Sequence, residues 1–333
     1  MNNMPKISVI IPVFNAQKYL LESIGSVLNQ TLKEIEIIVI NDGSTDQTLE
    51  ILESISIKDS RLIILNQKNS GQAIASNKAL EIAKGEYIKY FDADDLMNET
   101  HLESMYLKIV NKGDVLVSCK WARFYNDEII NARFIPCSTW KNLNSVDWLT
   151  NAMSEKYDMM PLWLWLIPKK LLLNLGGWDE RLTLNNDFEF SIRILTNARF
   201  VYFEEDAIIF YRSGHSNTLS SIKSEKLYEQ AFLSAKLGCN QLLKISKDSK
   251  MKLLCANKYA YWLQEIYPKY PILRKKIEFE IKNLGGANRV FQDSKFMLYL
   301  QKIIGWKWAK RLKMFFYNLG YAKLLSINKI YDK

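Results

Sequence analysis

The sequence is poor in the residues from which disulfide frameworks and dense metal clusters are built. Its 333 residues include four cysteines and two histidines, and no two cysteines have the CxxC spacing. We therefore expect reduced and mostly buried thiols, as is typical of cytosolic proteins. The most apolar stretch, 159–167, is far shorter than the roughly 20 residues that cross a bilayer. We also expect no leader peptide, because the amino terminus runs directly into a strand pattern.

A glycine-rich phosphate loop is also missing after the first apolar run. Pro12-Val13-Phe14-Asn15 stands there, whereas a sugar-phosphate nucleotidylyltransferase would need glycines that let its backbone approach the phosphates. The chain also has no internal repeat, no low-complexity linker and no recognised nucleic-acid-binding motif. The lack of such a motif argues against nucleic acid as a partner.

Acidic residues are scarce in the last third of the chain. Residues 221–333 contain 23 Lys and Arg but only 8 Asp and Glu, a balance of +15, so the net charge of +9 leaves −6 for residues 1–220. We expect a domain boundary at this change, followed by a basic and mostly helical C-terminal domain. The asymmetry predicts an anionic partner, and basic residues interleaved with aromatic ones over 306–317 favour an anionic membrane surface. Packing of these aromatics on the first domain is the alternative interpretation.

Apolar runs rich in β-branched residues alternate with helical patterns in the first hundred residues. Strands are expected near 6–14, 35–41, 61–66 and 86–92. Helices are expected between them, near 17–30, 46–57 and 72–84. This alternation predicts a parallel sheet covered by helices. Farther along, we expect a strand at 114–120, loops and short helices over 125–160, helices at 169–175 and 187–195, strands at 200–203 and 208–211, and helices from 222 onward.

The segment Phe91–Asp95 carries the strongest chemical signal. It follows a strand pattern and contains three aspartates, which repel one another unless water or a cation surrounds them. Carboxylates are ligands that Mg²⁺ and Mn²⁺ prefer. Asn15 and Asp42 end two earlier strands, and the carboxyl ends of parallel strands meet where such sheets bind ligands. We therefore expect these side chains to converge on one crevice.

Several stretches, taken in order, resemble glycosyltransferase family 2. They are Val9–Asn15, Ile38–Asp46, Asn69–Leu80, Gly85–Asp95, Gly176–Glu180 and Asn186–Phe190. Their order and spacing together are specific, and they extend over the first two thirds of the chain. The resemblance implies an α/β GT-A fold, the Rossmann-like domain of nucleotide-diphospho-sugar transferases, over residues 1–220. It also implies transfer of a sugar with inversion and Mn²⁺ or Mg²⁺ as the cofactor.

The resemblance further implies roles for individual residues. The nucleotide sugar would contact Pro12, Phe14, Asn15, Asp42, Asn77, Asp92 and Arg212. Among them, Arg212 would pair with the diphosphate in bidentate fashion. Asp94 would bind the metal with His215 as a second ligand, and Asp95 would support the loop. Trp178 would stack on the acceptor sugar; core packing is its alternative role, and a plain surface position is the alternative for His215.

Asp187 is the candidate catalytic base. In the family pattern an acidic pair supplies the base as its second member, whereas here the first member is Asn186. We expect the missing carboxylate to leave the pKa of Asp187 lower, because like-charge repulsion is lost. Glu189, two residues on, points toward roughly the opposite helix face and ranks behind Asp187. The structural alternative for Asp187 is capping of the helix that starts there.

These residues together predict a metal-dependent, inverting glycosyltransferase with a UDP-sugar as its donor. The acceptor would be a hydroxyl of a bacterial surface glycan, such as lipopolysaccharide or capsule, or of a lipid-linked precursor. We expect the protein in the cytoplasm, held peripherally on the inner face of the cell membrane, and leave self-association open. Asn186 also leaves open an alternative of another class, a catalytically silent sugar-nucleotide-binding or scaffold protein of the same fold.

Overall fold

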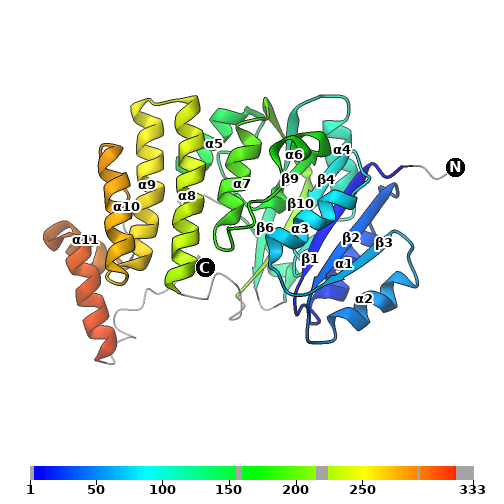
Figure 1. The fold of residues 1–333 in the computed structure, drawn as a ribbon, viewed down its shortest axis with the longest axis horizontal. Coiled ribbons are helices and arrows are strands. Elements are labelled where there is room, and N and C mark those ends of the chain that lie inside the picture. The colour runs from blue at the N-terminus through cyan, green and yellow to red at the C-terminus, as the bar shows by residue number, and fades with distance from the viewer. Residues whose placement is uncertain (1–3, 126, 155–159, 215–223, 291–292, 320–333) are drawn as a thin grey trace.

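The computed structural model describes residues 4–125, 127–154, 160–214, 224–290 and 293–319. An α/β part with a long sheet forms one end of the molecule, and a row of helices stands beside it (Figure 1). The strands of the sheet follow the order β3-β2-β1-β4-β9-β6-β10-β5. The expected α/β fold with a helical C-terminal region is thereby confirmed.

The first half of the sheet is parallel, as the apolar runs predict. Its strands are β1 (Ile7–Val13), β2 (Ile35–Asp42), β3 (Leu62–Gln67) and β4 (Tyr87–Tyr90). Three helices connect them: α1 (Leu20–Leu28), α2 (Thr48–Ser56) and α3 (Gln72–Ile82). Every residue of β2 is buried, and so is every residue of β1 except Pro12. Because both faces of these strands are covered, their sequences are continuously apolar instead of alternating.

The second half of the sheet is mixed. It contains β5 (Leu96–Met97), β6 (Val115–Tyr125), β9 (Trp165–Pro168) and β10 (Phe200–Ser213). Strand β9 is antiparallel to β4 and β6, whereas β10 is parallel to β6 and antiparallel to β5. The strands expected at 200–203 and 208–211 are parts of one strand, β10. The sequence looked like two strands because the register of β10 shifts between Glu204 and Ile208. Such a bulge interrupts the alternation that marks a strand in the sequence.

The segment 125–160, where we expected loops and short helices, also contains a ten-residue helix. Its described part holds the 3₁₀ helix η1 (Ile129–Asn131), the short strands β7 (Arg133–Phe134) and β8 (Leu143–Asn144), and α5 (Ser145–Ser154). Helix α5 buries Trp148, Leu149 and Ala152 and packs against α9 of the helical region. The rest of this half holds α4 (His101–Ile109), η2 (Leu162–Leu164), α6 (Lys169–Leu175) and α7 (Asn186–Leu195).

In the described residues the sheet is followed by α8 (Glu225–Ile245), α9 (Ser249–Ile266), α10 (Pro271–Asn283) and α11 (Lys295–Asn318), the last of which is kinked at Gly305. Helix α8 packs against both α7 and α9, so the apolar core continues across the boundary expected at residue 220. Within the described ranges, no helix has the length and apolar character needed to cross a bilayer. All four cysteines are free thiols and three are buried, as the sequence predicts.

Candidate functional site

A small cavity lies at the carboxyl ends of β1 and β4. It brings together Pro12, Asp92, Trp178 and Asp187, which the sequence assigns to four separate motifs. The remaining lining residues are Gln72, Ser76, Tyr90, Phe91, Leu162 and Trp163. Asn15, Asp42 and Asp94 are not among the lining residues, so their convergence on this crevice stays a prediction. Asp92 meets Trp178 and Asp187 from the segment around α7 instead.

Asp92 is the carboxylate of the acidic segment that faces this cavity. Burial is the main cause that raises its pKa to about 8, and the charges of Asp94 and Asp187 raise it further. Gln72 Nε2 donates to Asp92 Oδ1 at 3.4 Å. A carboxyl group with this pKa is mostly protonated at neutral pH unless a positive charge comes close.

Asp95 supports the acidic segment from inside the protein. Its side chain is fully buried, and its Oδ1 accepts the Arg212 backbone N–H at 2.8 Å. Burial holds the pKa of Asp95 well above its ordinary value, and the charges of Asp94 and Asp92 add to this effect. Its Oδ2 has no hydrogen-bond partner within the described part of the chain.

Arg212 is committed to the acidic segment. Its Nε donates to the Asp94 carbonyl at 2.7 Å, and its two terminal nitrogens each lie 2.6 Å from a carboxylate oxygen, of Asp127 and of Glu22. The guanidinium carbon lies 4.4 Å from the ring centre of Tyr19 and 4.6 Å from that of Phe124. These contacts place Arg212 behind the acidic segment as a positioning residue. They correct the expected bidentate pairing with a diphosphate, because the nitrogens already bind protein groups.

Asp187 is the second residue of α7 and faces the cavity opposite the acidic segment. Its pKa is raised to about 7 by burial, although a hydrogen bond from the backbone of Leu162 acts the other way. Burial therefore places this pKa above its ordinary value even without a second carboxylate at position 186. Asn186 Oδ1 accepts the Asp187 N–H at 3.1 Å, and the effect of its missing charge on the pKa stays a prediction. A carboxylate with a near-neutral pKa suits general base catalysis.

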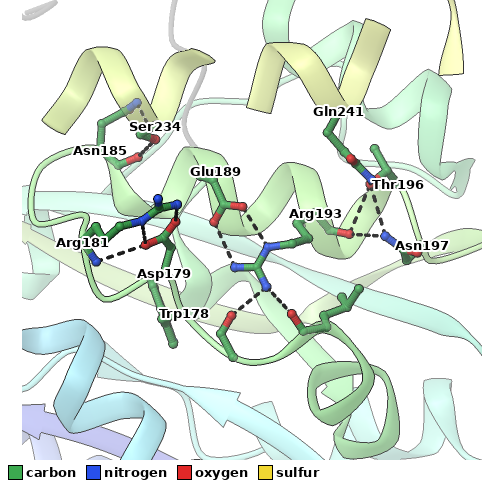
Figure 2. Close-up of polar contacts among 12 residues, drawn as sticks. Trp178, Asp179, Arg181, Asn185, Glu189, Arg193, Thr196, Asn197, Ser234 and Gln241 are labelled. Atoms are coloured by element: carbon green, nitrogen blue, oxygen red, sulfur yellow. Dashed lines mark hydrogen bonds and ion pairs between the residues drawn. The ribbon is translucent and has the colours of Figure 1, made fainter. Parts of the chain in front are cut away.

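Glu189 has a structural partner. Arg193 Nε donates to Glu189 Oε1 at 2.8 Å and Nη2 to Oε2 at 2.9 Å (Figure 2). Arg193 Nη1 in turn donates to the carbonyls of Leu175 and Gly177, both at 2.7 Å. The pair thus holds the loop after α6, which agrees with ranking Glu189 behind Asp187.

Trp178 belongs to this loop after α6, and Asn77 of α3 holds its backbone at the cavity. Asn77 Oδ1 accepts the Trp178 N–H at 2.7 Å, and Asn77 Nδ2 donates to the Trp178 carbonyl at 3.1 Å and to Glu180 at 2.9 Å. The Trp178 ring is 4% exposed and packs on Tyr90 and Phe190. Asn77 therefore positions the Trp178 loop, which corrects its expected contact with the diphosphate or sugar.

The residues expected around the nucleoside lie at the ends of β1 and β2. Phe14 is exposed, and Asn15 has a left-handed backbone (φ 50°) while its Oδ1 accepts the Thr45 N–H at 2.8 Å. Asp42 is buried and accepts hydrogen bonds at 2.7 to 2.8 Å from Gln67 and from the backbone of Ser70 and Gly71. Asp42 thus fixes the loop that starts α3, and Phe14 leaves a ring face open to solvent.

The donor set for a divalent cation consists of the carboxylates of the acidic segment. His215 lies outside the described residues, and among those described no three His, Cys, Asp or Glu side chains form a ready-made metal cluster. Mg²⁺ and Mn²⁺ sites in nucleotide-binding enzymes need only one or two carboxylates, since phosphate oxygens complete the shell. Burial is the main cause that raises the pKa values of Asp92 and Asp95, and a cation bound beside them would lower both. The residues present therefore fit such an ion.

Sequence reasoning missed two residues of the cavity wall, Gln72 and Ser76. They lie four residues apart on α3 and so share one helix face. The Ser76 Oγ is buried and has no hydrogen-bond partner within the described ranges. The signal that could have identified them is two polar residues spaced by four at the start of the helix that follows Gly71.

Comparison with known proteins identifies the class to which this fold and site belong. The chain superposes on the crystal structure of Staphylococcus aureus TarS residues 1–349 in complex with UDP-GlcNAc with a TM-score of 0.67 and 21% identity, covering 84% of this chain and 80% of that one. It shares the fold of that protein. Residues 8–158 match the family model described as glycosyl transferase family 2.

Curated relatives agree with this assignment. An uncharacterised glycosyltransferase of Methanocaldococcus jannaschii is 30% identical over 228 residues, which cover 67% of this chain and 77% of that protein. The chain therefore belongs to glycosyl transferase family 2. Glycosyltransferase GlyG of Streptococcus pneumoniae is 38% identical over 130 residues, but the match spans only 38% of this chain and 42% of GlyG.

Proposed function

We propose that the protein transfers a sugar from a nucleotide-diphosphate donor, a UDP-sugar, to a hydroxyl of a bacterial surface glycan or lipid-linked acceptor. The observation that carries the proposal is Asp187, a carboxylate with a pKa of about 7 that faces Asp92 across a cavity at the strand ends. Family membership and the fold shared with a UDP-GlcNAc-bound protein support this reading of the cavity.

In the proposed reaction, Asp187 accepts the proton of the acceptor hydroxyl as its oxygen attacks the anomeric carbon. The bond from that carbon to the diphosphate oxygen breaks, and the nucleoside diphosphate leaves with the bonding electrons. A single displacement of this kind inverts the configuration of the anomeric carbon. Asp94, with Asp92 beside it, would hold Mn²⁺ or Mg²⁺, which supplies charge neutralisation to the departing diphosphate.

The remaining residues hold the two substrates. Phe14, with an exposed ring, and Pro12 border the proposed nucleoside pocket, while Asp42 and Asn15 shape its loops. Trp178 lines the cavity and is the proposed acceptor contact. Arg212 keeps the Asp94 backbone in place from behind.

The test is release of UDP together with analysis of the product. The full chain is incubated with several UDP-sugars and Mn²⁺, with and without excess EDTA, and with glycan or lipid-linked acceptors. We expect acceptor-stimulated UDP release that EDTA abolishes, and an anomeric configuration in the product opposite to that in the donor. Retained configuration, or full activity in EDTA, contradicts the mechanism.

A second candidate is a silent nucleotide-sugar-binding protein, and Asn186 is the observation that favours it. Asn186 is buried and bonds to the backbone of Asp187 instead of providing a second carboxylate. This candidate predicts that UDP-sugars bind but that neither transfer nor hydrolysis follows.

We further propose that the protein acts in the cytoplasm as a peripheral protein of the inner membrane face, through α11. This helix has six Lys and Arg and no acidic residue. Trp308, Leu312 and Phe315 are exposed at helical spacing and Arg311 lies beside Trp308, as in helices that bind an anionic interface. The opposite side of α11 packs, with Ala309 buried and Lys313 paired to Asp293 at 2.8 Å. One face therefore stays available for lipid.

A further inference from the structure

Helix α8 packs against α7, the helix that carries Asp187. Its buried residues include the small side chains of Ala231, Ser234 and Ala235 as well as Gly238. Small side chains at this spacing let two helices approach closely, because little stands between their backbones. Helix α8 lies beyond the segment that matches the family model, which ends at residue 158. Its contact with α7 therefore concerns a part of the chain to which the match assigns no role.

Ser234 forms hydrogen bonds with Asn185, the residue just before α7. Its hydroxyl donates to the Asn185 carbonyl at 2.5 Å, and it accepts from Asn185 Nδ2 at 3.2 Å (Figure 2). Asn185 precedes α7 in a left-handed conformation (φ 62°), which side chains other than glycine adopt rarely and mostly where other contacts support it. Because Asn185 is two residues before Asp187, the direction in which α7 starts depends on this pair of hydrogen bonds.

Gly238 fixes α7 one turn farther along. A Cβ atom at position 238 would lie 2.7 Å from Phe188 Cε1 and 3.1 Å from Phe188 Cδ1, so any larger residue must displace the ring. Phe188 is 3% exposed and immediately follows Asp187. The Lys258 ammonium lies 4.1 Å from the centre of the same ring. The Phe188 ring is therefore closely packed, and a larger side chain at position 238 would shift it and Asp187 beside it.

The two helices also meet at the far end of α7. Gln241 Nε2 donates to Thr196 Oγ1 at 3.4 Å (Figure 2). Contacts at both ends mean that α8 determines where α7 lies along its length as well as how it starts.

We propose that Ser234 and Gly238 are positioning residues for sugar transfer, which set the place of Asp187 through Asn185 and Phe188. The inference rests on the proposed role of Asp187 as the base. Neither residue lines the cavity, so neither contacts substrate in this arrangement. The helical region thereby affects the reaction indirectly, through the position of α7.

The experiment places Gly238→Ala in two backgrounds, the wild type and Asp187→Asn. In the wild-type background we expect kcat to fall at least about tenfold while the donor KM changes less than about twofold, because misplacing a reacting group mainly affects the chemical step. In the Asp187→Asn background the same change should cost nothing further, since no base is left to misplace. Ser234→Ala should lower kcat in the same way with little change in the donor KM, and it replaces Gly238→Ala in the experiment if that variant folds poorly.

The matched control is Gly25→Ala. Gly25 also lies inside a helix, α1, and a Cβ atom there would meet nothing within 4 Å. We expect wild-type kcat and KM for this variant. Thermal unfolding and calorimetric binding of UDP accompany every variant.

Two results would overturn the inference. One is wild-type kcat in both Gly238→Ala and Ser234→Ala. The other is an equal loss from Gly238→Ala in both backgrounds, which indicates a general structural defect. If Asp187→Asn alone keeps wild-type turnover, the proposed base itself is wrong, and the failure belongs to the proposed function.

Discussion

Replacing Asp187 with asparagine should make the substrate-free protein more stable at alkaline pH while crippling transfer. The buried carboxyl has a pKa of about 7 in the folded protein, against an ordinary value of 3.8. Between these two values the unfolded chain has released its proton while the folded protein still holds it. Stability therefore decreases as the pH rises through this window, and the full penalty is present above pH 7.

The size of the effect follows from the same two values. They differ by about three pH units, and each unit corresponds to about 1.4 kcal/mol, so the ceiling is about 4 kcal/mol. Asparagine cannot ionise and keeps nearly the same shape, so it removes this cost. The gain in unfolding free energy of Asp187→Asn over wild type should be close to zero at pH 4, grow up to pH 7 and then level off.

The assay is denaturant unfolding of both proteins without ligand or metal at intervals from pH 4 to 9, followed by kinetics at pH 8. We expect turnover to fall by at least about a hundredfold, the usual contribution of a positioned base. A stability difference that does not change with pH would refute the buried-carboxylate argument. A variant that is more stable at high pH but fully active would place the base elsewhere.

Three further predictions concern the acidic segment, its support and α11. Asp94→Ala should abolish Mn²⁺-dependent UDP binding in calorimetry, because the main ligand of the cation is lost; unchanged binding would reject the metal assignment. Arg212→Ala should lower the unfolding free energy by about 2 to 4 kcal/mol, since it removes a buried charge with three partners, and a change below about 0.5 kcal/mol in urea unfolding would be inconsistent with its contacts. Trp308→Ser with Phe315→Ser should reduce co-sedimentation with anionic liposomes and leave UDP binding intact, and equal pelleting would return α11 to a packing role.

Local sequence pattern was enough for some elements. Strand β2 is mostly apolar and was predicted with its end one residue short, and the short helix α6, which ends at Gly176 in a left-handed conformation, was predicted with correct bounds. The bulge within β10 was missed because it breaks the period of two. Helix α5 lies in the region where loops and short helices were expected, but its bounds were not predicted.

The candidate site shows the same division between local and distant causes. The position of Asp92 just after β4 follows from the rule that ligands bind at the carboxyl ends of parallel strands, whereas Asp187 reaches the same cavity from the start of α7. The direction in which the pKa of Asp187 shifts could not be predicted, because it depends on burial by other segments of the chain. Arg212 binds Glu22 and Asp127, which are 190 and 85 residues away in the chain, and no local pattern announces such partners.

The loop that carries Trp178 has a consequence for engineering this enzyme family by exchange of segments. It is hydrogen-bonded both to Asn77, which lies on the helix after β3, and to Arg193 on α7. A Cβ atom at Gly177 would lie 2.5 Å from Asn77 Oδ1, so the loop accepts only a glycine opposite that amide. A chimera that imports residues 176–195 from another member to change acceptor choice must therefore import the residue at position 77 as well. The segment to exchange is therefore discontinuous in sequence: residues 176–195 and position 77 must be transferred together.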